Sequence, residues 1–172
     1  MTRVLIVDQL NKGLATLIKP TVLESVTVNS FDQLQQDDIL LWLPNDSDVD
    51  QQVFGLIDAI DGKQIKLSKI VMLSIAGVNG EVEEPRLQQW WGSDYQNLVL
   101  DYQYAIKMID ELELPYTIVR TTPIVINATT AVISNEGTGI NGDRIGQSQL
   151  AEVLSEACQP NRYLNQSIGI SE

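Results

Sequence analysis

The sequence contains no histidine. Histidine is the usual general base near neutral pH and the commonest transition-metal ligand, so catalytic triads that rely on it are excluded and no metal site is expected. Cys158 is the only cysteine, which also excludes an internal disulfide bond and any metal site built from several cysteines. We interpret Cys158 as a passive residue of a helix.

Basic residues are scarce as well. Eleven Lys and Arg residues stand against 23 Asp and Glu residues, and the formal net charge is -12. Such a surface repels phosphate backbones and anionic lipid, which disfavours binding to nucleic acid or to a membrane surface. The apolar runs have only the length of strands, and the N-terminal MTRVLIVD lacks the features of a signal peptide. We therefore expect no membrane span and a cytoplasmic location.

The clearest folding signal lies between Asn97 and Pro123. Apolar residues recur there at intervals of three and four, which predicts a helix with one buried stripe made of Leu98, Tyr102, Ala105, Ile109 and Leu112. Pro115 ends this pattern, and the apolar run Tyr116 to Val119 predicts a buried strand. A strand buried on both faces is typical of a parallel sheet covered by helices. The predicted fold is α/β, in a single domain over residues 1–172.

The rest of the chain repeats the order of strand, turn and helix. Short apolar runs predict further strands at 3–7, 22–28, 39–43, 69–73 and 163–170. Apolar residues at helical spacing predict helices over 10–18, 49–60 and 150–157. Pro20 is expected to end the first helix and Gly62 the second, and Ser47 with Asp50 has the spacing of a capping box. Residues 79–93 are expected to form a loop or a short helix.

The ends of these strands predict where a ligand would bind. In open α/β sheets, ligands lie beyond the carboxyl ends of the strands. The predicted crevice is formed by the residues at these ends: Asp8, Pro44, Ser74, Thr121, Thr122 and Pro123. For Ser74 the alternative is a hydroxyl that hydrogen-bonds its own turn.

The turn after the first strand has little glycine. In dinucleotide-binding folds this turn carries several glycines, which let the backbone approach the pyrophosphate. Here only Gly13 is present, and Asp8 places a negative charge where a phosphate would lie. The alternative role for Gly13 is to permit close packing of the helix on the strand.

Trp90 and Trp91 are adjacent in the polar segment after the fourth strand. Paired tryptophans usually pack in a core or an interface, and a stacking platform for a ligand ring is the alternative.

Five segments together resemble a known family. VLIV, VMLSIAG, YAIK, LPYTIVRTTPI and RIGQSQLAEVL stand in the order and spacing found in the atypical short-chain dehydrogenases, specifically the compact NmrA-like NAD(P)H-binding proteins. The resemblance implies a three-layer Rossmann-like fold with a mainly parallel sheet flanked by helices. In active members it implies hydride transfer between NAD or NADP and a quinone, flavin or carbonyl substrate. Other members bind the dinucleotide only as a signal and control a partner protein.

The sequence departs from the family pattern in its first third. The glycine fingerprint falls on Val7, Leu10 and Gly13, so bulky residues replace two of three glycines. Asn29 and Ser30 follow the second strand, where an arginine would hold the 2′-phosphate of NADP. The segment between Val28 and Ile39 is also short, as if a helix or strand had been lost there. We therefore expect dinucleotide binding to be weakened or absent, and binding of NADP more so than NAD.

The catalytic pattern differs too. Classical short-chain dehydrogenases carry a tyrosine four residues before a lysine, and counting back from Lys107 reaches Gln103. A displaced pair of Tyr104 and Lys107, three residues apart, is the catalytic candidate, and an exposed helix pair is the alternative. Ser74 matches the family serine after the fourth strand.

Two functions from different classes follow from the sequence. One is an NAD(P)H-dependent reductase in which Ser74, Tyr104 and Lys107 face the nicotinamide. The other is a non-catalytic Rossmann-like module that binds a small ligand or a protein partner without turnover. The sequence leaves the oligomeric state open, a homodimer included.

Overall fold

Seven strands form one sheet, in the order β2-β1-β3-β4-β5-β9-β7. The computed structural model describes residues 2–19, 24–128 and 130–172. The strands of this sheet are β1 Val4–Asp8, β2 Ser25–Val28, β3 Ile39–Leu43, β4 Lys69–Ile75, β5 Tyr116–Thr121, β7 Val132–Ser134 and β9 Gln166–Ser171. All neighbouring strands run parallel except β7, which pairs antiparallel with β9. Two short strands, β6 Ile124–Val125 and β8 Ile145–Gly146, pair separately above the sheet.

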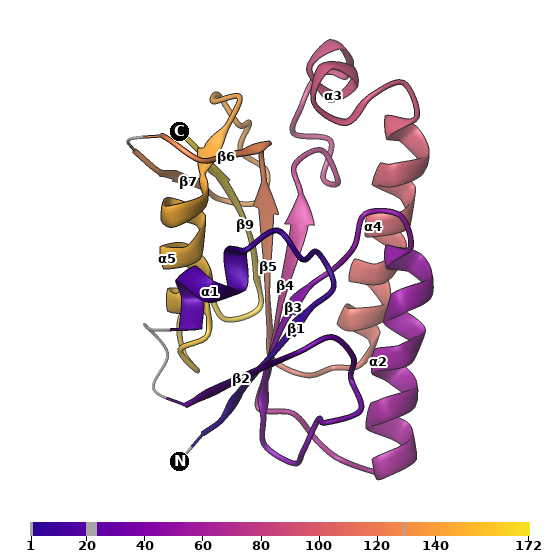
Figure 1. Ribbon diagram of the computed structural model, residues 1–172. Coiled ribbons are helices and arrows are strands. Elements are labelled where there is room, and N and C mark those ends of the chain that lie inside the picture. The colour runs from indigo at the N-terminus through magenta and orange to yellow at the C-terminus, as the bar shows by residue number, and fades with distance from the viewer. Residues whose placement is uncertain (1, 20–23, 129) are drawn as a thin grey trace.

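Helices cover both faces of the sheet (Figure 1). Their bounds are α1 Leu14–Ile18, α2 Val49–Lys63, α3 Glu84–Trp91, α4 Tyr95–Glu111 and α5 Gln147–Ala157. Helices α1 and α5 lie on one face, α2 and α4 lie on the other, and α3 lies above the carboxyl ends of the strands. The predicted three-layer Rossmann-like fold, with a mainly parallel sheet between helices, is confirmed.

The core consists of two layers because the central strands bury both of their faces. Side chains alternate along a strand, so Val4 and Ile6 of β1 pack toward α1 and α5, whereas Leu5 and Val7 pack toward α2 and α4. All four are at most 4% exposed. The stripe predicted for α4 lies against the sheet, with Tyr102, Ala105 and Ile109 buried. This two-sided burial fixes the register of the central strands and the positions of their carboxyl ends.

The connection between β2 and β3 explains the short first third of the chain. Residues 29–38 cross from β2 over β1 to β3 through bends and turns, without a helix. The resulting order of the first five strands, 2-1-3-4-5, places the reversal of winding between β1 and β3. A ligand crevice is therefore expected above these two strands and their neighbour β4.

Several predicted boundaries are wrong. Helix α1 begins at Leu14 and not near residue 10, because residues 9–13 form the turn after β1. Helix α2 passes Gly62 and ends at Lys63, with Gln64 in the left-handed conformation. The capping box does not form: Asp48 is the N-cap residue without a side-chain hydrogen bond, and the Ser47 hydroxyl donates to the Asn45 side chain at 2.9 Å.

The C-terminal region differs in two places. The last strand starts at Gln166 and not at Tyr163, because Tyr163 and Asn165 have positive φ angles and form a turn. Strand β7 is not among the predicted strands. Pro20 and the first residues of the predicted strand 22–28 lie outside the described residues.

Candidate functional site

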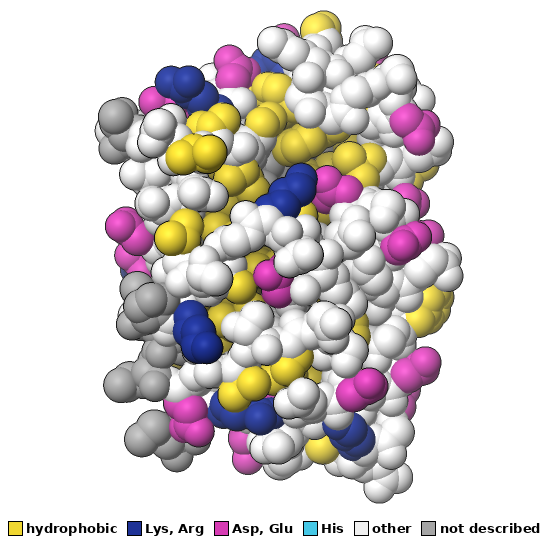
Figure 2. Space-filling view, in the orientation of Figure 1, with side chains coloured by type: hydrophobic (Ala, Val, Ile, Leu, Met, Phe, Trp, Pro, Cys, Tyr) yellow, Lys and Arg dark blue, Asp and Glu magenta, His cyan; other side chains and the backbone are white. Residues whose placement is uncertain are grey.

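A cavity of about 430 Å³ opens at the carboxyl ends of β1, β3, β4 and β5. Volumes of this order are typical of small-molecule sites. Its walls come from the turn after β1, the segment after β3, the end of β4, helices α3 and α4, and the segment after β5. Figure 2 shows hydrophobic side chains gathered in the upper part of this face, with a basic and an acidic side chain side by side below them. The cavity lies at the switch point that the strand order defines.

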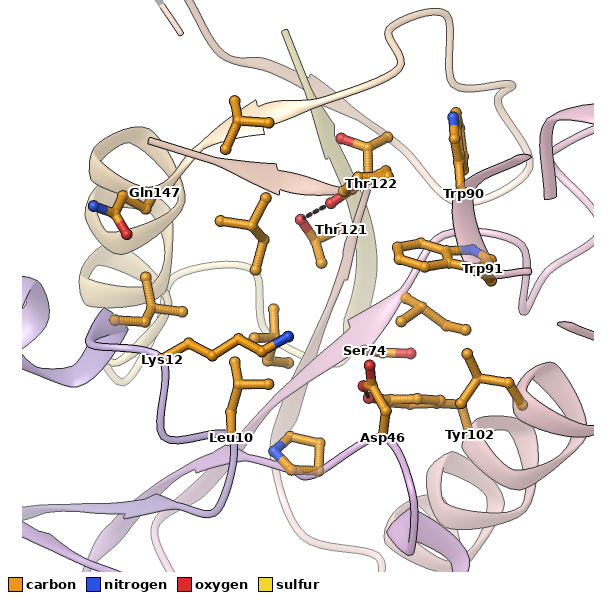
Figure 3. A pocket seen from close by; sticks show the side chains of 18 of the residues that line it. Leu10, Lys12, Asp46, Ser74, Trp90, Trp91, Tyr102, Thr121, Thr122 and Gln147 are labelled. Carbon is orange, nitrogen blue, oxygen red and sulfur yellow. Dashed lines mark hydrogen bonds between the residues drawn. The ribbon is translucent and has the colours of Figure 1, made fainter. Parts of the chain in front are cut away.

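The structure brings five of the predicted site residues to this cavity. They are Pro44, Ser74, Thr121, Thr122 and Pro123. They meet because β3, β4 and β5 are parallel neighbours in register, with Ser74 opposite Arg120 and Ile75 opposite Thr121. Parallel strands end at the same edge of the sheet, so residues far apart in the sequence face one cavity (Figure 3).

Ser74 carries a buried hydroxyl without a hydrogen-bond partner among the described residues. Its side chain is 1% exposed, and its Oγ accepts or donates no hydrogen bond within the described part of the chain. The alternative of a serine that hydrogen-bonds its own turn is therefore not what the structure shows. A buried hydroxyl without a partner costs about 1–3 kcal/mol. A bound ligand that hydrogen-bonds Ser74 would remove this cost.

The two threonines of the site are already satisfied. Thr121 Oγ1 donates to the Thr122 carbonyl at 2.8 Å, and Thr122 Oγ1 donates to the Ile170 carbonyl at 3.3 Å. These bonds hold the chain where it leaves β5. They leave Ser74 as the unpaired hydroxyl among the three.

Asp46 and Tyr102 form a hydrogen-bonded pair in the cavity wall. The Tyr102 hydroxyl of α4 donates to Asp46 Oδ1 in the segment after β3. Burial, and then the neighbouring Asp46 carboxylate, raise the pKa of the Tyr102 phenol well above its usual value near 10. Tyr102 is thus a neutral donor at physiological pH, and it holds the Asp46 carboxylate in place.

Lys12 carries the positive charge of the site. Among the cavity-lining residues of the described chain it is the one cation, and Asp46 is the one anion. In Figure 3 the Lys12 side chain extends from the turn after β1 into the cavity, with its nitrogen directed toward Ser74 and Asp46. No ion pair or hydrogen bond of the Lys12 ammonium occurs within residues 2–19, 24–128 and 130–172.

Asp8 and Gly13 lie outside the cavity lining. The Asp8 carboxylate accepts a hydrogen bond from the Asn11 backbone amide at 2.8 Å, which closes the turn. Gly13 has a φ of 81° and precedes α1, and a Cβ there would meet no atom within 4 Å, so its conformation and not close packing requires glycine. Both residues shape the turn that carries Leu10 and Lys12 into the cavity.

Trp90 and Trp91 both line the cavity. The Trp91 indole nitrogen donates to the Ala76 carbonyl at 3.1 Å, and the two rings meet edge to face at 6.1 Å between centroids. The Trp90 indole nitrogen is buried, and no acceptor for it occurs in the part of the chain that the structure describes. In this chain the tryptophans belong to a pocket wall, where Trp91 presents its ring to the interior (Figure 3).

A buried ion pair holds the segment that leads to these tryptophans. Arg120 of β5 pairs with Glu81, and the two side chains are 0% and 2% exposed. Arg120 also donates to Ser167 Oγ at 2.9 Å, and Glu81 accepts the Gly77 amide at 2.6 Å. Gly77 has a φ of 110°, and a Cβ there would lie 2.4 Å from Leu87 of α3. The segment between β4 and α3 is therefore fixed tightly over the sheet.

Tyr104 and Lys107 do not line the cavity. Tyr104 is 40% exposed, and its ring lies 6.0 Å from that of Phe54 on α2. Lys107 is exposed one turn further along α4, and Gln103 donates to the Val78 carbonyl at 2.8 Å. The tyrosine of α4 that reaches the cavity is Tyr102, from the buried stripe.

Sequence reasoning missed Lys12, Asp46 and Tyr102 as site residues. The sequence pattern gave no site role to Asp46 and placed Tyr102 in the buried stripe of a helix. A buried tyrosine needs a partner for its hydroxyl, and an aspartate directly after a strand is well placed to supply one. That combination was a usable signal, whereas nothing in the sequence gives the direction of the Lys12 side chain.

A comparison with models of known families identifies the family of the chain. Residues 14–160 match the model of an NAD(P)H-binding family. The chain belongs to this NAD(P)H-binding family. The match begins at the first residue of α1, directly after the turn that carries Asp8 and Lys12. No curated protein sequence matches the chain.

Solved structures share the fold at low sequence identity. A wide-type short-chain dehydrogenase/reductase from Veillonella parvula in complex with NADP superposes with a TM-score of 0.75 at 16% identity, over 99% of this chain and 94% of that one. A Rossmann-fold NAD(P)-binding family protein from Shigella flexneri gives 0.73 at 15% identity, over 100% and 94%. The oxidoreductase ylbE from Lactococcus lactis gives 0.68 at 14% identity, over 99% and 90%. In the described part of the chain, no helix is both long and apolar enough to cross a membrane.

Proposed function

We propose that this protein is an NAD(P)H-dependent oxidoreductase of the atypical short-chain dehydrogenase type, with an altered phosphate site and an altered catalytic site. The observation that carries the proposal is the buried, unpartnered Ser74 hydroxyl in a cavity at the switch point of the sheet. Membership of the NAD(P)H-binding family supports the same ligand. A nicotinamide ring supplies a hydride to a small carbonyl, quinone or flavin when it is bound.

The residues of the cavity fit a nicotinamide ring. Its carboxamide offers both a donor and an acceptor for Ser74, and Trp91 offers an apolar face for stacking. The Thr121 and Thr122 hydroxyls donate to backbone carbonyls and keep the neighbouring wall of the cavity in shape. Ser74 is the residue that would orient the ring, and its hydroxyl is a candidate proton donor to the substrate.

The same structure supports weakened dinucleotide affinity. The bulky Val7 and Leu10 stand at two fingerprint positions, and Leu10 lines the cavity. The family match also starts only after this turn. Asn29 and Ser30, which follow β2, supply no positive charge for a 2′-phosphate, so NAD is favoured over NADP. We expect measurable but modest affinity for the reduced dinucleotide.

A non-catalytic role is the second candidate. It is favoured by the positions of Tyr104 and Lys107, which lie outside the cavity and leave the site without the tyrosine and lysine of the classical enzymes. In that case the cavity would bind a nicotinamide dinucleotide or another small ligand as a signal, and a protein partner or a second copy of the chain would respond.

Calorimetric titration with NADH and NADPH tests the proposal. We expect saturable binding of NADH, weaker binding of NADPH, and quenching of tryptophan fluorescence by either one, because Trp91 lines the cavity. Turnover of a quinone or flavin with NADH would support the reductase, whereas binding without turnover would support the second candidate. Absence of binding at millimolar NADH and NADPH would contradict both forms of the dinucleotide proposal.

A further inference from the structure

Three backbone amides of the turn after β1, those of residues 9–11, are already occupied. Gln9 and Leu10 both donate to the Leu43 carbonyl, at 2.9 and 3.1 Å, and Asn11 donates to the Asp8 carboxylate at 2.8 Å. In dinucleotide-binding folds, free amides at this place bind the pyrophosphate. Three consecutive amides of this turn are therefore not available to an anion. Helix α1, with five residues, is too short to replace them.

We propose that the Lys12 ammonium is the anion-binding group of this site, in place of these three backbone amides. Lys12 belongs to the same turn, enters the cavity, and is the one cation among the described lining residues. Its ammonium keeps three donors without a protein acceptor in the described chain. In a protein with a net charge of -12, an unpaired ammonium that lines a cavity attracts a phosphate to that place.

The charges of the cavity also set the orientation of the ligand. Lys12 comes from the β1 side, and Trp91 lies across the cavity beyond Ser74 (Figure 3). Asp46, held by Tyr102, disfavours an anion on its own side. A nicotinamide nucleotide would thus place its phosphate at Lys12 and its uncharged ring near Ser74 and Trp91. This inference rests on the proposed nicotinamide ligand and names the residue that binds the phosphate.

A ligand series with and without phosphate tests this inference. The probes are NADH, reduced nicotinamide mononucleotide and reduced nicotinamide riboside, which lacks phosphate, each titrated into the wild type, Lys12→Met and Lys66→Met. Lys66 is exposed at the opposite end of β4 and serves as the matched charge control. For Lys12→Met we expect affinity for both phosphate-bearing ligands to fall about tenfold or more, and affinity for the riboside to stay within about twofold. Lys66→Met should leave all three unchanged.

The outcomes separate this inference from the proposed function. If Lys12→Met binds NADH as tightly as the wild type, the Lys12 site is wrong and the nicotinamide proposal stands. If no nicotinamide ligand binds the wild type, thermal stabilisation by inorganic pyrophosphate is the second measurement. Stabilisation of the wild type but not of Lys12→Met would then support the Lys12 site without the proposed function. Equal stabilisation of both, or none, would overturn the Lys12 site as well. The melting temperatures of the free variants control for folding.

Discussion

The two ends of strand β4 carry buried polar side chains in opposite states. At its start, Lys69 is 0% exposed, and its ammonium donates to the carbonyls of Ala157, Gln159 and Arg162 at 2.5–3.0 Å. At its end, Ser74 is 1% exposed and no partner for it occurs among the described residues. The protein itself thus supplies hydrogen-bond partners for the buried polar side chain at the amino end of the strand, but not for the one at the carboxyl end.

The difference shows which buried polar groups serve the fold and which are free to bind a ligand. Lys69 uses all three donors to bind the carbonyls at and after the C-terminus of α5, where a positive charge also favours the helix dipole. Ser74 has a buried, unpartnered hydroxyl in the lining of a cavity. Burial alone therefore does not mark a functional residue, whereas burial without a partner beside a cavity does.

Near the carboxyl end of β4, the Arg120–Glu81 pair differs from Ser74 because both of its side chains are buried and partnered. Breaking this pair should have the largest effect on stability. For Glu81→Ala we expect a loss of about 3–5 kcal/mol in the free energy of unfolding, because a buried guanidinium would lose its counter-charge. Urea denaturation monitored by tryptophan fluorescence measures it. Glu111→Ala, at an exposed position of α4, is the control and should stay within about 0.5 kcal/mol. Similar losses of unfolding free energy in the two variants would show that this pair does not stabilise the fold.

The thiol of Cys158, which lies near Lys69 at the start of β4, reports on burial there through the pH dependence of its labelling. Burial raises the pKa of this thiol to about 12, although the nearby Lys69 ammonium opposes the shift. At pH 8 we expect labelling of the native protein by a thiol reagent to be about a thousandfold slower than labelling in denaturant, since the thiolate is the reactive form. The native rate should rise about tenfold per pH unit toward pH 12. A native rate within about tenfold of the rate in denaturant would show that the thiol is neither buried nor shifted in pKa.

Lys69→Met removes the hydrogen bonds of the buried ammonium at the start of β4. We expect it to lower the free energy of unfolding by about 3 kcal/mol, because three carbonyls near the end of α5 would lose their donor. For a chain of this length, the melting temperature should fall by roughly 10 °C. Lys66→Met changes the same charge on the surface and should change it by no more than about 2 °C. Equal effects would mean that Lys69 is dispensable to the fold.

Ser74→Ala should do the reverse. Removal of an unpartnered hydroxyl is expected to leave the free energy of unfolding within about 1 kcal/mol of the wild type, or to raise it slightly. Affinity for the reduced dinucleotide should fall about five- to tenfold through the lost hydrogen bond. Thermal melts and calorimetry of one preparation measure both quantities. A clear loss of stability without a loss of affinity would assign Ser74 to the fold and not to the site.

The fold could be predicted because its main elements are strongly periodic and buried. The stripe of α4 and the apolar runs of β1, β3, β4 and β5 each allow only one assignment, and a strand buried on both faces requires helices on either side. Strand β7 could not be found in this way. It has three residues, two of them exposed, and it exists through its pairing with β9.

The site was predictable to the extent that it follows from strand ends. Pro44, Ser74 and Thr121 meet because parallel strands end together. Tyr104 was chosen over Tyr102 from its spacing to Lys107, although the helical stripe already placed Tyr102 toward the sheet. The Lys12 contribution depends on the path of an irregular turn, which the sequence pattern does not determine.

A crystal structure of the protein grown with millimolar NADH tests the central claim most directly. We expect the nicotinamide ring between Trp91 and the end of β4, with its carboxamide within hydrogen-bond distance of Ser74 Oγ, at about 2.7–3.2 Å. An empty cavity under these conditions, or a dinucleotide bound elsewhere with Ser74 still unpartnered, would contradict the account.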